Sequence, residues 1–222
     1  MIKGLYTAHT GMVNEMKRLD VLTNNLANAD TTAYKKEGTT SRTFADELAI
    51  KIKDASEAFV NRGLGSMSMG VKFGETYRDY TQGSLRVTDN TYDLALSGDG
   101  FFQIAFTNKQ GETSVKLTRD GNFTVNVEGY LVTKDGDFVL GTDGSPIQID
   151  PNSETKIDAA GRIIQDDAVV ANIAVVDVED YNYLQKYGEN MYDTVEGYQI
   201  SDDKPTVVQG YLEMSNVNVV SE

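Results

Sequence analysis

The chain has 222 residues, a formal net charge of −14 and no cysteine. Its length suffices for one good core, or for one core with an appended element. The missing cysteines exclude a disulfide framework, a thiolate metal site and a cysteine nucleophile. The acidic surface argues against nucleic acid and anionic lipid as partners.

The charge is unevenly distributed along the chain. Residues 1–60 carry eight basic and eight acidic side chains, whereas residues 61–222 carry 12 basic and 26 acidic ones. The neutral first quarter is therefore able to pack against copies of itself without long-range repulsion. The first six residues include no continuous apolar segment of the kind that a cleaved signal peptide needs. If the protein works outside the cytoplasm, we expect it to leave by another route.

Residues 1–34 predict one long helix. Its apolar side chains recur with steps of three and four, broken only at Glu15: Leu5, Ala8, Met12, Leu19, Leu22 and Leu26. Such a narrow stripe is typical of a coiled-coil seam rather than of an ordinary surface helix. The helix is too polar elsewhere to cross a membrane, which requires about 20 consecutive apolar residues. We therefore expect the seam to pack against another helix, from this chain or from a second copy.

The end of this helix is rich in amides. Asn24, Asn25 and Asn28 are followed by Asp30, and such residues favour caps and turns over helix interiors. We expect the helix to end between Asn28 and Thr32. Two interpretations of the amides remain open. They form the end of the helix, or they hydrogen-bond across a packed helix interface and fix its register.

Residues 35–75 predict an extended connector, the least regular part of the chain. A short amphipathic segment is expected around Phe44, Leu48, Ile50 and Ile52. Residues 61–70 are rich in small side chains and predict a flexible loop. Their glycines do not have the spacing of a phosphate-binding loop. A strand pattern begins at Val71.

Residues 76–206 predict a mainly antiparallel β domain. Turn signals follow one another at intervals of seven or eight residues: Asp120-Gly121, Glu128-Gly129, Asp135-Gly136 and Asp143-Gly144. Alternating apolar residues lie between them, which indicates a meander of short strands, closed as a barrel or packed as a sandwich. Gly100 ends an earlier strand pair, and we expect positive φ at Gly121, Gly129 and Gly136. Together with the helix, the fold class is α+β.

The sequence offers no catalytic, cofactor or metal site. Asp135, Asp137 and Asp143 suggest calcium, but the spacing is not that of an EF-hand, and turn formation explains these residues. His9, the single histidine, lies on the predicted helix, and no serine has the flanking glycines of a nucleophile elbow. We therefore expect neither an enzyme nor a bound cofactor.

Five sequence blocks, in this order, resemble the bacterial flagellar basal-body rod and hook proteins. They span nearly the whole chain: Met1–Ala8 with Gly11 and Met12, Asn24–Thr31, Gly98–Gln103, Thr118–Phe123 and Gly210–Asn218. Among the members of that family the chain is most similar to the rod proteins, of distal or proximal type. The hook protein carries larger outer domains than 222 residues can hold.

The resemblance implies an organisation of the chain. Residues 1–34 would form the tube-lining half of a helical hairpin, residues 35–75 the connector, residues 76–206 the outer domain and residues 207–222 a return segment. The family's C-terminal helix is expected to be missing, and trimming is the preferred explanation. The usual Gly-Phe after the Asn-rich block is Ala33-Tyr34 in this sequence. We expect residues 207–217 to run back beside residues 30–45.

The resemblance also implies a function, a structural subunit that polymerises into the flagellar rod and serves motility. Its partners would be copies of itself, other rod and hook proteins and the flagellar type III export apparatus, and its place the basal body in the cell envelope. Neither nucleic-acid binding nor membrane insertion is expected. The predicted assembly interface comprises Leu5, Met12, Leu19, Leu22, Asn24, Asn25, Leu26 and Asn28, and the structural turns are Gly100, Gly121, Gly129 and Gly136.

Two other functions remain open at this point. The first is a secreted β-rich binding module, an adhesin or a glycan binder, whose helix acts as a stalk. Aromatic side chains on one strand face would favour it, with Tyr77, Tyr80, Tyr92 and Tyr130 as candidates. The second, less favoured, is a calcium-dependent enzyme.

Overall fold

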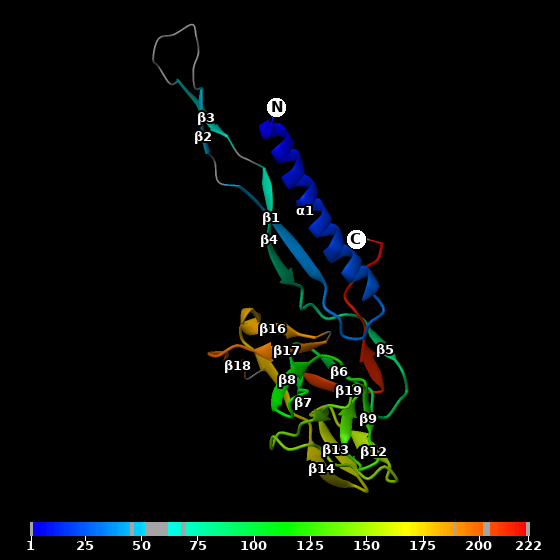
Figure 1. Cartoon of the computed structure of the whole chain (residues 1–222). Helices are drawn as coiled ribbons and strands as arrows, with labels where there is room; N and C mark the ends of the chain where they lie inside the picture. Colours follow the sequence, from blue (N-terminus) through cyan, green and yellow to red (C-terminus); the bar gives the residue numbers. More distant parts are fainter. Residues whose placement is uncertain are drawn as a thin grey trace. The chain divides into compact units, whose positions relative to one another are not determined.

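The computed structural model describes residues 2–44, 47–51, 62–67, 70–188, 190–201 and 205–220. Side chains are described for residues 4–44, 70–188, 190–201 and 205–220. The chain divides into two compact units (Figure 1). Unit 1 is built from residues 1–27 and 36–79, and unit 2 from residues 28–35 and 80–221. One N-terminal helix followed by antiparallel strands confirms the α+β class.

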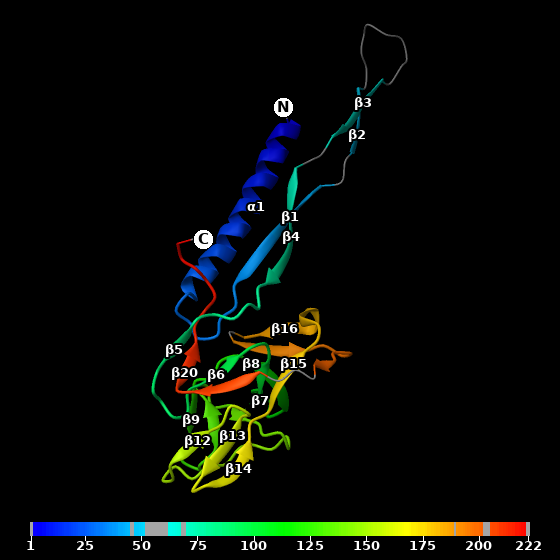
Figure 2. The same cartoon turned by 180° about the vertical axis from the view of Figure 1, so that it is seen from behind.

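Unit 1 combines the helix with a long β-hairpin. Helix α1 (Ile2–Ala27) ends one residue before the predicted range, where the amide-rich sequence turns. It lies along the antiparallel pair β1 (Glu37–Thr43) and β4 (Val71–Arg78), as both views of the chain show (Figures 1 and 2). Beyond this pair the hairpin continues as β2 (Glu47–Lys51) and β3 (Arg62–Met67), which pair with each other.

The prediction of a loop at residues 61–70 is therefore wrong over most of its length. Residues 62–67 form β3, and Ala49 lies opposite Gly65 in its antiparallel pairing with β2. A glycine-rich strand carries no alternation of apolar and polar residues, so its own sequence does not mark it. The predicted amphipathic segment coincides in part with β2, whereas Ile52 lies outside the described residues.

Unit 2 is an open antiparallel β structure. Its largest sheet has nine strands and runs in the order β16-β17-β8-β7-β11-β10-β9, with β15 and β18 attached through β7. This sheet does not close on itself, so the barrel alternative is wrong. Its strands are β7 (Phe101–Thr107), β8 (Thr113–Thr118), β9 (Phe123–Val125), β10 (Leu131–Thr133), β11 (Phe138–Val139), β15 (Val175–Val178), β16 (Leu184–Tyr187), β17 (Met191–Thr194) and β18 (Ile200–Ser201).

Three smaller groups of strands complete unit 2 (Figure 2). One is a three-stranded sheet, and two are antiparallel pairs that bring the end of the chain back to the middle of the sequence. A short 3₁₀ turn, η1 (Tyr181–Tyr183), precedes β16. The strands are β12 (Thr155–Ile157), β13 (Arg162–Gln165), β14 (Ala168–Asn172), β6 (Leu94–Ser97) with β19 (Thr206–Gln209), and β5 (Leu85–Val87) with β20 (Tyr211–Glu213).

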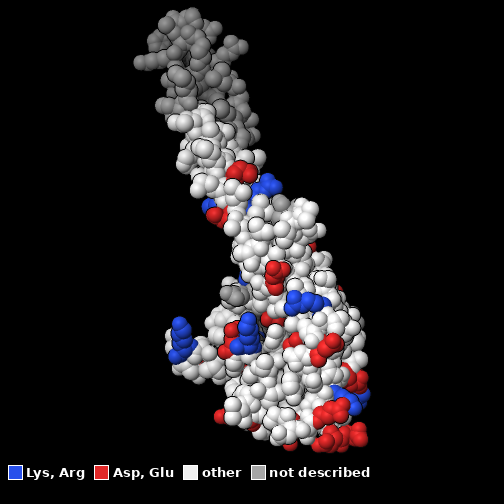
Figure 3. Space-filling model, turned by 90° about the vertical axis from the view of Figure 1, so that its right-hand side faces the viewer, with Lys and Arg blue, Asp and Glu red and all other residues white. Residues whose placement is uncertain are grey.

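The core of unit 2 lies among these strands. Phe102 and Phe123 are fully buried and meet edge to face, with ring centroids 5.2 Å apart. A second, smaller cluster surrounds Phe101, Leu184 and Tyr192. On the face that Figure 3 shows, acidic side chains gather over unit 2. The large apolar core and the acidic surface both belong to the part of the chain that carries the net negative charge.

The turn glycines fulfil the prediction only in part. Gly129 and Gly136 have φ of +84° and +96°, and Gly100 has φ of +139°. Gly121 does not have positive φ. It is needed because the strand β6 backbone passes so close that a Cβ at residue 121 would overlap the carbonyl oxygen of Leu94. Leu94 N also donates to Gly121 O over 3.0 Å.

We expect substitution by alanine to have different effects at Gly121, which a neighbouring backbone approaches closely, and at Gly136, which has positive φ but open space around it. Gly121→Ala should lower the free energy of unfolding by on the order of 3 kcal/mol, because a buried backbone must move to admit the methyl group. Gly136→Ala meets no neighbouring atom, so only its positive φ is strained, at about 1–2 kcal/mol. Urea unfolding of both variants measures the difference. Equal losses would contradict the close approach at Gly121.

Candidate assembly surface

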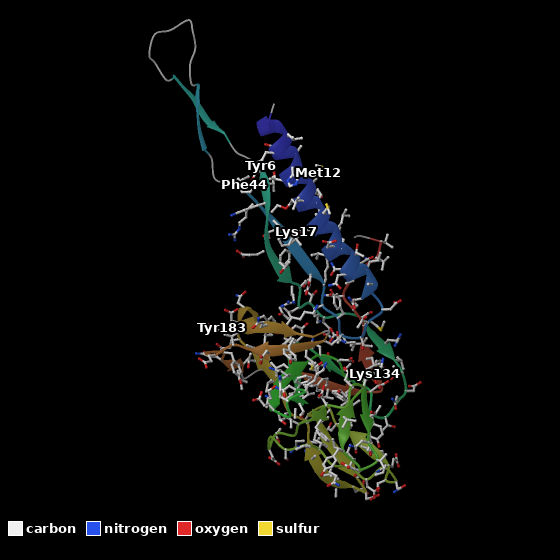
Figure 4. The ribbon with its side chains drawn as sticks, viewed as in Figure 1. Tyr6, Met12, Lys17, Phe44, Lys134 and Tyr183 are labelled. Carbon is white, nitrogen blue, oxygen red and sulfur yellow. The ribbon has the colours of Figure 1, made fainter. Side chains whose placement is uncertain are left out.

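The predicted seam of α1 is exposed. Its four heptad-spaced members are 72%, 60%, 59% and 52% exposed: Leu5, Met12, Leu19 and Leu26. Ala8 is exposed as well, and Leu22 is half-buried. Figure 4 shows Met12 on the side of α1 that points away from β1 and β4. A continuous apolar stripe on the surface of a helix is a surface that a second helix is able to cover.

The asparagines at the helix end have separate environments. Asn25 is fully buried inside unit 1, where its Nδ2 donates to Glu37 O over 2.8 Å and its Oδ1 accepts from Glu37 N over 3.0 Å. Asn28 Oδ1 accepts from the Thr31 hydroxyl over 3.2 Å, which is turn chemistry, and Asn24 is exposed. The oxygen and the nitrogen of the Asn25 side chain both form hydrogen bonds with the backbone of the hairpin in the same subunit. The structure therefore gives Asn25 a role within unit 1 rather than a hydrogen bond to another subunit.

The segment that follows α1 is held in unit 2 by the returning chain. Ala33 N donates to Glu213 O over 2.8 Å, and Asn216 N donates to Tyr34 O over 3.4 Å. These bonds confirm that the return segment runs beside the segment that leaves the N-terminal helix. Ala33 is buried and has φ of +57°, the left-handed region in which glycine is favoured.

Ala33→Gly should therefore stabilise unit 2. Glycine relieves the left-handed strain at this residue, and the gain is reduced by the greater freedom of the unfolded chain, which leaves about 0.5–1 kcal/mol. Thermal unfolding followed by tyrosine near-UV circular dichroism measures the change. Ala171→Gly in β14 is the matched control, because glycine inside a strand destabilises it by about 0.5–1 kcal/mol. A loss of stability in both variants would contradict the strain at Ala33.

A buried ion cluster fixes the same junction within unit 2. The Lys35, Arg119 and Glu213 side chains are at most 2% exposed. Lys35 Nζ donates to Glu213 Oε1 over 2.6 Å, and Arg119 Nε donates to Glu213 Oε2 over 3.0 Å. Lys35 Nζ also donates to Thr81 O over 2.8 Å. Gly83 N donates to Glu213 Oε1 over 2.9 Å. The Glu213 carboxylate therefore joins the segment after the helix, the start of the domain and the return segment.

Arg119 adds a further segment to this cluster. Its two terminal nitrogens donate to Gly100 O over 2.5 Å and to Gly98 O over 2.7 Å. The blocks around residues 98–103, 118–123 and 210–218 thus meet at one buried site. Sequence reasoning identified these blocks but not the ion pairs, because a lone Arg or Glu in a strand gives no sign of its partner about 90 or 180 residues away.

A polar cavity of about 700 Å³ lies beside Asp120 in unit 2. Asp120 accepts hydrogen bonds from Asn122 N over 3.2 Å and from Asn190 Nδ2 over 3.4 Å. Burial raises the pKa of Asp120 above its ordinary value of 3.8, and the hydrogen bond from Asn122 opposes this rise. Asp135 and Asp137 also line the cavity. Within the described ranges, no group of three or more His, Asp or Glu side chains is arranged to hold a metal ion.

The raised pKa of Asp120 predicts a pH dependence. Folding favours the neutral carboxyl relative to the unfolded chain, so this stabilisation is fully present below pH 3.8 and is lost as the pH rises through the folded-state pKa. Asp120→Asn cannot ionise, so its stability relative to the wild type should rise between about pH 4 and pH 7. Urea unfolding across this range tests it. Asp158 is the comparison, because its pKa is lowered by its hydrogen bond with Arg162. For Asp158→Asn the change in relative stability has the opposite sign and occurs below about pH 4, so little slope is expected within the tested range.

His9 is exposed on α1, away from any described cavity. In the part of the chain that the structure describes, no helix combines the length and the apolar character needed to span a bilayer.

Comparisons with known proteins agree with this architecture. Residues 5–35 match the family described as flagella basal body rod protein, and residues 95–165 match the flagellar hook protein FlgE/F/G D1 domain. A rod-type helix joined to a β domain of this type defines a component of the flagellar hook and basal body.

Individual relatives define the family. The flagellar basal-body rod protein FlgF of Caulobacter vibrioides is 33% identical over 224 residues, which cover 100% of this chain and 85% of that protein. FlhO, a flagellar hook-basal body complex protein of Bacillus subtilis, is 32% identical, with 100% and 87% covered. FlgG, a flagellar basal-body rod protein of Bacillus subtilis, is 30% identical, with 100% and 88% covered.

The chain belongs to the family of flagellar basal-body rod proteins. It is a structural subunit of the rod, located in the flagellar basal body.

Proposed function

We propose that the exposed seam of α1 is the surface through which this subunit assembles into the rod. The observation that carries the proposal is the exposure of Leu5, Met12, Leu19 and Leu26, which are spaced by seven residues. Figure 4 shows Met12 on the side of α1 away from the hairpin. Seven-residue spacing fits the packing of a helix against a helix rather than against a sheet. The occupant of the seam is an α-helix of a neighbouring rod or hook subunit, including copies of this chain.

The charge distribution supports this assignment. Residues 1–60 are neutral overall, so helices of neighbouring subunits are able to approach without net repulsion. Unit 2 carries the acidic surface, and like-charged outer parts favour contact through the helices instead. The asparagines Asn24 and Asn28 belong to the proposed interface, whereas Asn25 acts within unit 1.

The proposal extends to the route and the place of assembly. The subunit leaves the cytoplasm through the flagellar type III export apparatus, without a cleaved signal peptide, and works in the cell envelope as a polymer without catalytic activity. The described residues show no arrangement of catalytic side chains that would suggest an enzymatic role beside assembly. The relatives, named as rod proteins, favour assembly over the glycan-binding alternative.

Electron microscopy tests the proposal. The purified chain is imaged by negative stain over a hundredfold range of concentration, alone and with purified rod subunits. We expect tubes or short filaments that become more frequent with concentration. Monomers at every concentration that instead bind components of a glycan array would overturn the assembly role and favour the binding module.

A further inference from the structure

Helix α1 contacts its own hairpin through a polar side. A groove beside β1 is lined from the helix by Arg18, Val21 and Leu22. The residues at the centre of the hairpin side follow one another with steps of three and four: Tyr6, Thr10, Asn14, Lys17, Val21 and Asn25. We call them the polar stripe. A helix that packs on a sheet ordinarily buries its apolar side and exposes its polar side. The arrangement in unit 1 is the reverse.

Specific bonds hold the polar stripe in place. Asn25 makes two hydrogen bonds with the backbone of Glu37, and Asn14 Nδ2 donates to Ser41 Oγ over 3.1 Å. Both asparagines are buried, at 0% and 6% exposure. Lys17 Nζ lies 5.3 Å from the centroid of the Phe73 ring, and Figure 4 shows Lys17 on the hairpin side of the helix.

The seam is diametrically opposite to the polar stripe. Each heptad-spaced seam residue is nine positions from a residue of the stripe, so that Leu5 matches Asn14 and Leu26 matches Lys17. Nine residues make about two and a half turns of helix, which places the two sides half a turn apart. The rotation that satisfies Asn14 and Asn25 is thus the rotation that points the seam away from the hairpin.

An alternative packing competes with this one. If α1 rolled by half a turn, Leu5, Met12, Leu19 and Leu26 would lie against β1 and β4, and the hydrophobic effect would favour their burial. The seam would then be unavailable to another helix. The roll is opposed because it takes away the two hydrogen bonds between the partly buried backbone of Glu37 and the fully buried Asn25, and moves Asn14 away from Ser41.

We propose that Asn14 and Asn25 are positioning residues that fix the rotation of α1 on its hairpin and so keep the seam available for assembly. The significance of the seam rests on the proposed function, whereas the rotation itself is a property of unit 1 alone. A buried polar group that selects one packing among several acts in this way in other helical assemblies.

Thiol labelling measures the rotation directly, because the sequence has no cysteine. Leu19→Cys places a thiol on the seam, and Val21→Cys places one on the polar stripe. Each is combined with the natural asparagines or with Asn14→Ala and Asn25→Ala together, and maleimide modification is timed in dilute monomer. With the natural asparagines, Leu19→Cys should react with maleimide at least tenfold faster than Val21→Cys, so the ratio of the two rates should be at least ten. In the double-alanine background this ratio should fall below one while the helix content is retained.

The matched control is Asp20→Ala, at an exposed polar residue outside both the seam and the polar stripe, which should leave the ratio unchanged. An unchanged ratio in the double-alanine background at native helix content would overturn the proposal. If the helix melts there, Asn14→Ala alone decides, since Asn25 keeps the helix attached, and the ratio must still fall at least threefold. Polymerisation is scored separately. If the ratio of labelling rates falls below one but polymers form normally, Asn14 and Asn25 do fix the rotation of the helix, and the assembly role of the seam is refuted.

Discussion

Glu213→Gln is expected to lower the free energy of unfolding of unit 2 by about 3–5 kcal/mol, which corresponds to a fall of roughly 10 °C in Tm. The variant keeps the shape of the side chain but removes the one negative charge that Lys35 and Arg119 share. Two buried cations then face each other without compensation. Urea unfolding followed by tyrosine near-UV circular dichroism measures the loss.

Two further variants separate the ion cluster from ordinary charge loss. Glu154→Gln removes a carboxylate whose side chain is 80% exposed, from a pair with Lys156, and should change stability by less than about 0.5 kcal/mol. Replacing Lys35, Arg119 and Glu213 together by Met, Leu and Leu should be less harmful than Glu213→Gln alone, because no uncompensated charge remains. If the triple variant is less stable than Glu213→Gln, uncompensated charge is not the cause of the loss of stability in Glu213→Gln.

The element that sequence reasoning predicted best is α1. Its apolar residues keep their period over more than six turns, and the amide-rich end supplies a local stop signal, so both its course and its end follow from short-range patterns. The strands around Phe102, Phe123 and Ile163 were also predictable, since each alternates between apolar and polar residues or is continuously apolar.

The remainder depends on contacts that are distant in sequence. Strand β3 has no pattern of its own and exists because β2 pairs with it. Gly121 was predicted as a turn glycine, but the backbone of Leu94, 27 residues earlier, is what excludes a side chain there. Asn25 was placed in the predicted interface with the help of the family resemblance, although the amides alone left a helix end equally open, and only the position of Glu37 reveals its internal role. Local sequence cannot specify any of these partners.

Leu19→Glu is expected to abolish assembly of the subunit while its fold persists. Leu19 is 59% exposed in the separate chain, so a carboxylate at this residue remains hydrated and changes the stability of unit 1 little. In an assembled helix pair the same carboxylate would be buried against an apolar side chain. The lost leucine burial and the uncompensated charge together weaken the contact by about 4 kcal/mol, which raises the critical concentration roughly a thousandfold.

The control for this prediction is Val13→Glu, which places the same charge at an exposed apolar residue outside the seam. Far-UV circular dichroism of dilute monomers should be the same for the two variants and the wild type, so that any difference in assembly belongs to the contact between subunits. Sedimentation and negative-stain imaging then measure polymer. Because a partner helix on the seam cannot avoid Leu19, filaments of Leu19→Glu that form at the concentration of the wild type would show that assembly uses another surface.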